Sequence, residues 1–527
     1  MKKILLLALF WSAIALGQED AWIYFADKPD ADFYLANPLE MLSQRALDRR
    51  AAQNIALDET DVPVYTDYVS QVEDTDGITV MAQSKWLNAV HVRGSVEDIA
   101  ELQTLNFVSS IQYANHSLNA GRPMAERSTF TGKLMDVQAD FPYGNSANQI
   151  EMLQGHLLHQ QDYTGAGKII AVLDAGFPGV NTAPAFARLR DNNQILGGYN
   201  FPDRDLNIYS RNNHGTLVLS TMGGYVENQL VGTAPDAGYY LFISEDINVE
   251  NPIEESYWVE AAEMADSLGV DIINSSLGYF TYDNPAYSYV YADMDGQTGF
   301  ASRGASIASS KGIVVVVSAG NSGATVNPHI NVPSDADNIL TVGAVNAAGT
   351  YVGFSSVGPS ADGRIKPDVM AQGAASVIAN TLGNVTTGNG TSFSSPIMAG
   401  MVASLWQAVP ELTAQQIMQV IRESAHLYNN PNEQYGYGIP NFETALALAL
   451  NRDAFSVDGF AVYPNPFGSW LEIQGATDFT LFDATGRKVF SHYNWSGPIK
   501  TESLQSGLYY YRLGNGSKVK TGKIIKQ

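Results

Sequence analysis

The sequence contains no cysteine. A chain without cysteine has no disulfide, no thiol nucleophile and no zinc site built on thiolates. Basic residues are also scarce, since 30 Lys and Arg side chains stand against 54 Asp and Glu side chains and leave a formal charge of −24. A surface of this sign repels phosphate backbones and anionic lipid headgroups, so we expect no nucleic-acid partner.

Long apolar runs are missing too, apart from one near the N-terminus. Two lysines precede an apolar stretch from Ile4 to Leu16, and small residues occur at Ala15 and Gly17. This pattern is typical of an export signal and predicts a signal peptide over residues 1–17. No later run approaches the ~20 residues of a membrane-spanning helix, so the sequence predicts no transmembrane segment.

The 527 residues allow roughly three domains at ~150 residues each. Residues 18–140 start with the order β-α-β-β-α-β, a split βαβ pattern, and end in a linker without periodicity. Residues 145–452 alternate short apolar strands with helical segments, which predicts an α/β fold with a parallel sheet covered by helices on both faces. Residues 455–527 read as short alternating strands between turns and predict a β-sandwich.

Ligands of such a sheet bind beyond the carboxyl ends of its strands, so catalytic candidates should follow the strands. Asp174 ends the apolar strand 168–174, where a buried carboxylate without a partner would be costly. His214 lies in a polar turn before an apolar helix, and Ser392 lies at the helix start "NGTSFSSPIMAG". Taken singly, each has a structural alternative: a turn-forming Asp, a structural His and a helix-capping Ser.

The chain order of these residues narrows the choice. Asp, His and Ser follow one another in subtilisin, whereas α/β-hydrolases and chymotrypsins use other orders. Four motifs accompany the order, one around each of the three residues and one around Asn321: "IIAVLDAGF", "NNHGT", "VVSAGNSG" and "NGTSFSSPIMAG". On these motifs, residues of about 150 to 450 resemble the subtilisin family (subtilases) of serine peptidases.

The resemblance implies an endopeptidase that cleaves peptide bonds through an acyl-enzyme and needs no cofactor for the chemistry. It implies Ser392 as nucleophile, His214 as general base and Asp174 as the carboxylate that orients it. Asn321 would donate a hydrogen bond to the oxyanion. Small residues after two strands would pair with the main chain of an extended substrate: Ser276, Leu277, Gly278, Ser318, Ala319 and Gly320.

The sequence departs from the family pattern at two supporting positions. Ala175 stands where a hydroxyl residue is common, and Leu217 stands where a second histidine is frequent. The segment "ADMDGQTG" (292–299) resembles an acidic calcium loop, but Asp293 and Asp295 alone favour a turn. Structural calcium therefore stays open.

Both flanking regions resemble known modules of exported peptidases. Residues 18–140 are similar to the inhibitory propeptides of subtilases, with a mature interaction domain as the alternative. Residues 455–527 resemble the type IX secretion sorting domains of Bacteroidetes, with a carbohydrate- or protein-binding sandwich as the alternative. The motifs that carry this second resemblance are "YPNPF", "LFDATGRKV", "LQSGLYYYRL" and "KTGKIIK".

We therefore expect export through the periplasm by the type IX machinery, and a secreted or cell-surface location. Protein or peptide substrates are the expected partners, together with the chain's own propeptide as inhibitor. Two rival functions remain: a catalytically silent binding protein on a subtilase scaffold, and a processing peptidase of narrow specificity. The aromatic segment 279–294 either borders the cleft or packs as a surface loop.

Overall fold

The computed structural model describes residues 17–119, residues 141–452 and most of residues 461–526. The predicted export signal and the linker at 120–140 thus lie outside the described residues, apart from Gly17. Contacts divide the chain into two compact units, residues 1–443 and 444–527, each described by itself here. Within the second unit the parts left undescribed are 464–469, 475–477, 484–485, 493–498, 502–503 and 516–517.

The first unit begins with a four-stranded antiparallel sheet in the order β2-β3-β1-β4. Its strands and the two helices that follow the split βαβ order are β1 (Glu19–Phe25), α3 (Thr66–Glu73), β2 (Thr79–Ser84), β3 (Ala89–Gly94), α4 (Val96–Glu101) and β4 (Val108–Tyr113). Between β1 and α3 the chain adds the helices α1 (Ala31–Ala36) and α2 (Gln44–Ala52). The sequence alone does not indicate α1, because this helix buries no side chain and so lacks an apolar face.

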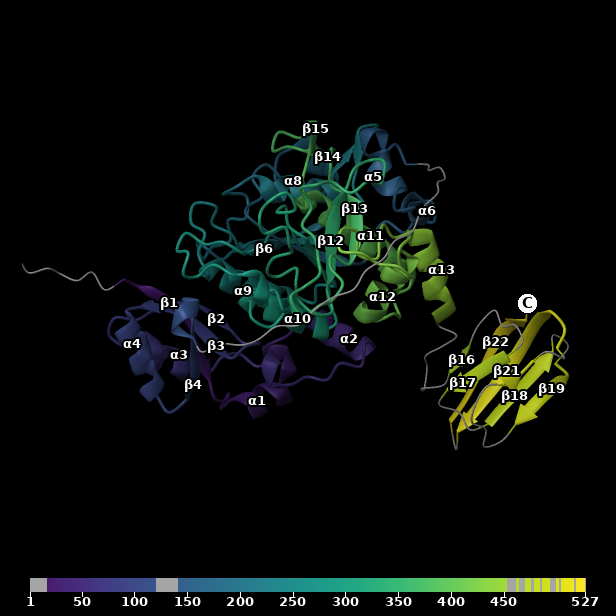
Figure 1. The fold of residues 1–527 in the computed structure, drawn as a ribbon, viewed down its shortest axis with the longest axis horizontal. Coiled ribbons are helices and arrows are strands. Elements are labelled where there is room, and N and C mark those ends of the chain that lie inside the picture. Colours follow the sequence, from purple (N-terminus) through teal and green to yellow (C-terminus); the bar gives the residue numbers. More distant parts are fainter. Residues whose placement is uncertain are drawn as a thin grey trace, which may run out of the picture. The chain divides into compact units, whose positions relative to one another are not determined.

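A seven-stranded sheet in the order β13-β12-β11-β10-β5-β9-β6 forms the centre of this unit, and its neighbouring strands pair in parallel (Figure 1). Continuous apolar runs in the sequence predict five of these strands, at 168–174, 238–244, 269–276, 312–320 and 338–345. The strands are β5 (Ile169–Asp174), β6 (Ile195–Asn200), β9 (Gly238–Ile243), β10 (Ile272–Ser275), β11 (Val314–Ser318), β12 (Leu340–Val345) and β13 (Val369–Gln372).

Helices cover both faces of the sheet, as the sequence predicted. On one face Leu173, Ile273 and Val317 share a core with Trp258 and Phe300 of the neighbouring helices α9 (Ile253–Leu268) and α10 (Phe300–Ser310). The other face packs against α11 (Thr391–Ala408), which in turn contacts α8 (His214–Gly223). The sheet thereby places its carboxyl edge beside the starts of α8 and α11.

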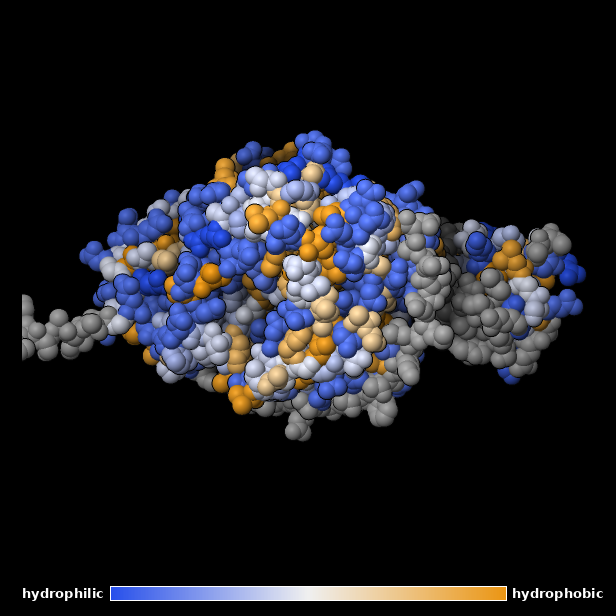
Figure 2. Space-filling model, turned by 90° about the horizontal axis from the view of Figure 1, so that it is seen from above, coloured by the Kyte–Doolittle hydropathy of each residue, from blue (hydrophilic) through white to orange (hydrophobic). Residues whose placement is uncertain are grey.

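Shorter elements complete the unit around the sheet. They are α5 (Ala147–Glu151), α6 (His156–His159), α7 (Ala187–Asp191), β7 (Tyr225–Val226), β8 (Leu230–Val231), β14 (Ser376–Ala379), β15 (Val385–Gly388), α12 (Ala414–Ser424) and α13 (Phe442–Arg452), which continues into the second unit. Hydrophilic side chains cover most of the face shown in Figure 2, and apolar ones form small groups. Within the described ranges, no helix has the length and hydropathy to cross a bilayer.

The aromatic segment 279–294 is packed rather than free. The hydroxyls of Tyr282 and Tyr289 both donate to Glu255 Oε1 at 2.6 Å, and the Ala301 amide donates to Glu255 Oε2 at 2.9 Å. Glu255 is fully buried on α9, so its carboxylate depends on these donors. The tyrosines therefore hold the segment against α9 and α10.

The second unit contains two antiparallel sheets, β16-β17-β20 and β19-β18-β21-β22. Leu471 and Ile499 of one sheet share a core with Phe479, Tyr511 and Leu513 of the other, which is the predicted sandwich arrangement. The "YPNPF" motif lies mostly outside the described residues. The strands are β16 (Ala461–Tyr463), β17 (Trp470–Gln474), β18 (Asp478–Asp483), β19 (Lys488–His492), β20 (Ile499–Lys500), β21 (Gly507–Asn515) and β22 (Lys518–Lys526).

Candidate active site

A carboxylate and an imidazole meet at the carboxyl edge of the central sheet. Asp174 is the last residue of β5 and is fully buried, while His214 is the first residue of α8 and keeps 31% of its side chain exposed. His214 Nδ1 lies 2.7 Å from Asp174 Oδ1, which also accepts the amide of Ala175 at 2.7 Å. With Nδ1 donating to the carboxylate, Nε2 is the nitrogen left to act on a hydroxyl.

The electrostatics of this pair favour a charged imidazole. Burial lowers the pKa of His214, but the charge of Asp174 and its hydrogen bond outweigh burial and raise that pKa above 6.5. Asp174 Oδ2 is buried and has no hydrogen-bond partner among the described groups. A hydroxyl residue after Asp174 could have donated there, and Ala175 cannot.

Ser392 is the second residue of α11, and local sequence explains how it is presented. Gly390 precedes the helix with φ +149°, a conformation that favours glycine. Pro396 has no N–H to donate to the carbonyl four residues back, which is that of Ser392. Ser276 Oγ donates to this free carbonyl at 3.0 Å and so ties the start of α11 to the end of β10.

Ser392 is 9% exposed, and its hydroxyl has one weak hydrogen-bond acceptor, Ser276 O at 3.5 Å. The ring of Phe393 lies 6.4 Å from that of His214, which places α11 beside the imidazole. Among the described residues, no hydrogen bond joins the Ser392 hydroxyl to His214. Such bonds are often long in free enzymes and tighten when substrate binds.

Asn321 follows β11, and the oxygen of its carboxamide faces the chain while the nitrogen faces away from it. Its Oδ1 accepts from the amide and the hydroxyl of Thr391 at 2.9 and 3.1 Å, which leaves the Nδ2 donors to the open side. A Cβ atom added to Gly390 would lie 3.6 Å from the Ser392 amide nitrogen and 3.7 Å from Asn321 Nδ2. The Ser392 amide and Asn321 Nδ2 therefore both lie within contact distance of one point beside Gly390.

The two predicted substrate-binding segments lie at the ends of the adjacent strands β10 and β11. Ser276, Ser318 and Ala319 are buried, and Leu277 and Gly278 lie at the exit of β10. The Ala319 amide donates to Val342 O at 2.9 Å and the Gly320 amide to Thr391 Oγ1 at 3.2 Å. These two amides already have acceptors within the chain, so pairing with a peptide through them remains a prediction.

Sequence reasoning missed Asn331, which lies between the two segments. A Cβ added to Gly278 would lie 2.2 Å from Asn331 Nδ2, and one added to Gly320 would lie 3.3 Å from it. No side chain can stand at Gly278 while Asn331 keeps this place, because real contacts are never so short. A lone asparagine in a loop carries no sequence signal for such a position.

Among the described residues, no group of three or more His, Asp or Glu side chains is placed so that it could hold a metal ion. In the acidic segment, Asp295 accepts the amides of Gln297 and Thr298 at 2.8 and 2.7 Å, and Asp293 accepts that of Val290 at 2.8 Å. These bonds are those of turns, which the sequence favoured over a calcium loop.

Comparison with models of known protein families shows to which family this chain belongs. The profile of the subtilase family matches residues 165–438, more than half of the chain. The chain belongs to the subtilase family. Profiles of the Bacteroidota peptidase S8 propeptide domain and of a secretion system C-terminal sorting domain match residues 20–130 and 461–527 of this subtilase.

Individual proteins are also similar to this chain in sequence or in fold. The subtilase is 30% identical to a subtilisin of Bacillus pumilus and 28% identical to subtilisin DY of Bacillus licheniformis, over 58% of this chain and 98% of each relative. Its fold is similar to that of a variant of the epidermin leader peptide processing serine protease (EpiP) of Staphylococcus aureus. That match has a TM-score of 0.54 at 16% identity and covers 82% of this chain and all of the other.

These matches make the subtilase a serine-type peptidase with a propeptide domain. The sorting-domain match indicates type IX secretion to the cell surface or beyond it.

Proposed function

We propose that the protein is a serine endopeptidase whose nucleophile, base and orienting carboxylate are Ser392, His214 and Asp174. The observation that carries this proposal is the 2.7 Å hydrogen bond between His214 Nδ1 and Asp174 Oδ1, beside the helix start that bears Ser392. A buried carboxylate bonded to Nδ1 orients the ring and stabilises the imidazolium that catalysis creates.

In the proposed reaction, Ser392 Oγ attacks the substrate carbonyl while His214 Nε2 takes its proton. Asn321 Nδ2 and the Ser392 amide donate to the resulting oxyanion, and their shared space beside Gly390 supports this assignment. His214 then returns the proton to the leaving amine, which leaves an acyl-enzyme on Ser392. Water, deprotonated by His214, attacks the acyl carbonyl and frees the acid and the serine.

We assign the flanking domains as the sequence predicts: residues 18–140 act as inhibitory propeptide and linker, residues 145–452 carry the activity, and residues 455–527 engage the type IX machinery. The antiparallel sheet of residues 19–113 supports the first assignment, because Ser84, Lys85 and Trp86 all donate to Glu263 of α9 at 2.7 to 3.1 Å. The signal peptide is assigned to residues 1–17.

Active-site labelling tests the proposal. A fluorophosphonate should attach to Ser392 and not to Ser394 or Ser395, which mass spectrometry of the labelled peptide can distinguish. The labelling rate should rise with pH through the pKa of His214, above 6.5, because only the neutral imidazole accepts the serine proton. An adduct on another residue, or none on processed protein, would exclude the mechanism.

Replacing Asn321 by leucine should lower kcat by about 10²- to 10³-fold with little change in KM, as measured for the corresponding donor of a subtilisin. The oxyanion exists only after attack, so its donor stabilises the transition state and not the bound substrate. Steady-state kinetics on a peptide substrate checks this. Asn327→Leu, an exposed asparagine of the same loop, is the control and should behave as the wild type.

Asn331 predicts a preference for small side chains at the residue whose carbonyl is attacked. That side chain should enter the gap between Gly278 and Gly320, which the Asn331 carboxamide fills. We expect Asn331→Gly to raise kcat/KM for phenylalanine substrates over alanine substrates by about tenfold or more, since each accommodated methylene is worth about 10-fold or more. A peptide library would show the shift. An unchanged preference would place the specificity elsewhere and leave the narrow-specificity alternative without this support.

A further inference from the structure

The propeptide touches the catalytic domain at a second place, away from its sheet. The sheet docks along α9 between Ser256, which accepts from Trp22 Nε1 at 2.9 Å near the start of the helix, and Glu263. The helix α2 instead reaches the end of α9, at Asp266, and the following residues up to Asp271. Figure 1 shows α2 apart from the propeptide sheet, beside α10 and α12 of the catalytic domain.

Buried charges form the centre of this contact. Arg49 pairs with Asp266, and Arg50 Nη2 lies 2.7 Å from Asp266 Oδ2 and 2.8 Å from Asp61 Oδ1. Lys311 of the catalytic domain lies 3.2 Å from Asp61 Oδ1, so the pairs cross between the domains in both directions. All five side chains are at most 4% exposed.

The position of Asp266 makes the two arginines important for it. A carboxylate in the last turn of a helix faces the negative end of the helix dipole. Asp266 lies in the last turn of α9, which contains no basic residue of its own. Arg49 and Arg50 lie in the last turn of α2, where cations are favoured. The propeptide therefore supplies the positive charge that the end of α9 lacks.

Hydrogen bonds from the residues that flank α2 add to the ion pairs and fix the orientation of this helix. Gln53 Nε2 donates to Gly312 O at 2.8 Å, and Gln53 Oε1 accepts the Ala414 amide at the start of α12, also at 2.8 Å. The Ser43 amide donates to Ser267 O at 2.9 Å. One short helix thus contacts the end of α9, the approach to β11 and the first residue of α12.

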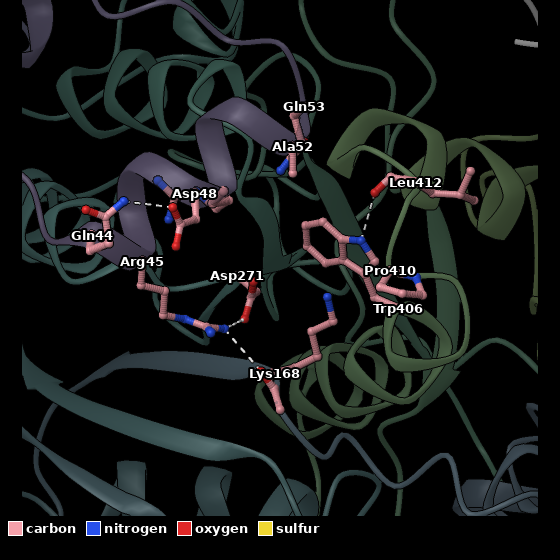
Figure 3. A pocket seen from close by; sticks show the side chains of 12 residues that line it. Gln44, Arg45, Asp48, Ala52, Gln53, Lys168, Asp271, Trp406, Pro410 and Leu412 are labelled. Atoms are coloured by element: carbon pink, nitrogen blue, oxygen red, sulfur yellow. Dashed lines mark hydrogen bonds and ion pairs between the residues drawn. The ribbon is translucent and has the colours of Figure 1, made fainter. Parts of the chain in front are cut away.

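The contact is open to solvent on one side. A cavity of about 540 Å³ lies beside α2, with Arg45 and Asp48 on one wall and Lys168 and Trp406 on the other (Figure 3). Arg45 reaches across to pair with Asp271 and keeps 39% of its side chain exposed. Ions can approach this outer pair, so the contact should weaken with salt.

We propose that α2 and the segment 58–61 form a second anchor, which holds the propeptide on the catalytic domain after the linker has been cut. The anchor is independent of the cleft, so cutting the chain between the domains does not remove it. Release of the processed propeptide then requires the buried pairs at Asp266 to separate. This inference rests on the proposed function only in taking the retained propeptide as inhibitory.

The variant Arg49→Met tests the anchor, because it alters only the propeptide and leaves the mature peptidase unchanged in sequence. The full-length chain is allowed to process itself, and propeptide dissociation is followed by size-exclusion chromatography in 0.05 and 0.5 M NaCl. We expect Arg49→Met to speed dissociation at least about tenfold, because it leaves Asp266 short of a buried partner. Salt should speed dissociation of the wild type and of the variant by a similar factor, because both keep the exposed Arg45–Asp271 pair.

Two controls separate the anchor from general damage. Arg93→Met removes an arginine that pairs with Asp20 inside the propeptide and makes a single long hydrogen bond of 3.3 Å to Asn251 of the catalytic domain, so the propeptide should be released at close to the wild-type rate. Asp266→Asn should speed release like Arg49→Met, and the double variant should be no faster than the faster single one, because both changes break the same pair. Wild-type rates in Arg49→Met, or additive effects in the double variant, would overturn the anchor.

The outcome is separable from that of the proposed function. A wild type that neither processes itself nor labels with fluorophosphonate would contradict the peptidase mechanism. The anchor can still be tested on that chain, because trypsin can cut the linker after Arg127 or Lys133. If the wild type is active and the propeptide dissociates from the Arg49→Met variant at the wild-type rate, only the anchor is contradicted.

Discussion

Ser392→Ala is expected to lower kcat for peptide hydrolysis by about 10⁶-fold, the loss measured when this serine is removed from a subtilisin. Without the hydroxyl no acyl-enzyme forms, and what remains is catalysis by the oxyanion donors and by substrate binding. The Ser392 side chain makes only one 3.5 Å hydrogen bond, so the fold should keep its melting temperature. Single-turnover hydrolysis and calorimetry measure both quantities.

The same variant should also remain uncut between the propeptide and the catalytic domain, which electrophoresis of the purified chain shows directly. Ser394→Ala is the matched control, since its hydroxyl is buried two residues away and donates to Thr391 O at 3.0 Å. It should keep labelling by fluorophosphonate and activity within about tenfold of the wild type. Labelling of Ser392→Ala at the wild-type rate would refute the nucleophile.

Asp174→Asn has the second largest expected effect, a loss of about 10⁴-fold in kcat near neutral pH. The carboxamide nitrogen would donate toward His214 Nδ1 and favour the tautomer that protonates Nε2, so the ring could no longer accept the serine proton. The variant should fold, because Asn has the size of Asp and the turned carboxamide gives up only the 2.7 Å hydrogen bond that Asp174 Oδ1 accepts from the Ala175 amide.

The pH dependence distinguishes this effect from simple misfolding. In the wild type, kcat/KM should rise as His214 loses its proton, at a pKa that Asp174 holds above 6.5 against the effect of burial. Asp174→Asn removes the charge that raises this pKa, so the rise should move to lower pH. Asp203→Asn, which breaks an ion pair with Arg211 nearby, should leave the profile in place. Unchanged position and height in Asp174→Asn would contradict the assigned role.

The central sheet was largely predictable, because strands buried on both faces leave continuous apolar runs such as Ile169 to Leu173. The strand β6 escaped prediction, since its sequence ILGGYN lies at the sheet edge and is mostly half-buried. The strand β13 is four residues long and has too little sequence for a period to appear. Edge and short strands are specified by their neighbours more than by their own pattern.

Within the site, sequence could point to Asp174, His214, Ser392 and Asn321, because each stands in a motif of unusual composition at the end of an element. It could not point to Asn331, whose position depends on how two strand ends approach each other. The burial of Arg49 and Arg50 was even harder to predict from the sequence, because charged residues on a helix are ordinarily exposed. Their partner Asp266 stands 217 and 216 residues further on, beyond the reach of any local pattern.

The strand β1 lies between β3 and β4, although it comes first in the chain. Its Trp22 bonds to a residue 234 positions later, and Gln53 bonds to one 361 positions later. Contacts of such separation form slowly, because long loops must close before any of them is made. The contacts that Trp22 and Gln53 make with the catalytic domain therefore cannot all form until the chain has been made as far as Ala414.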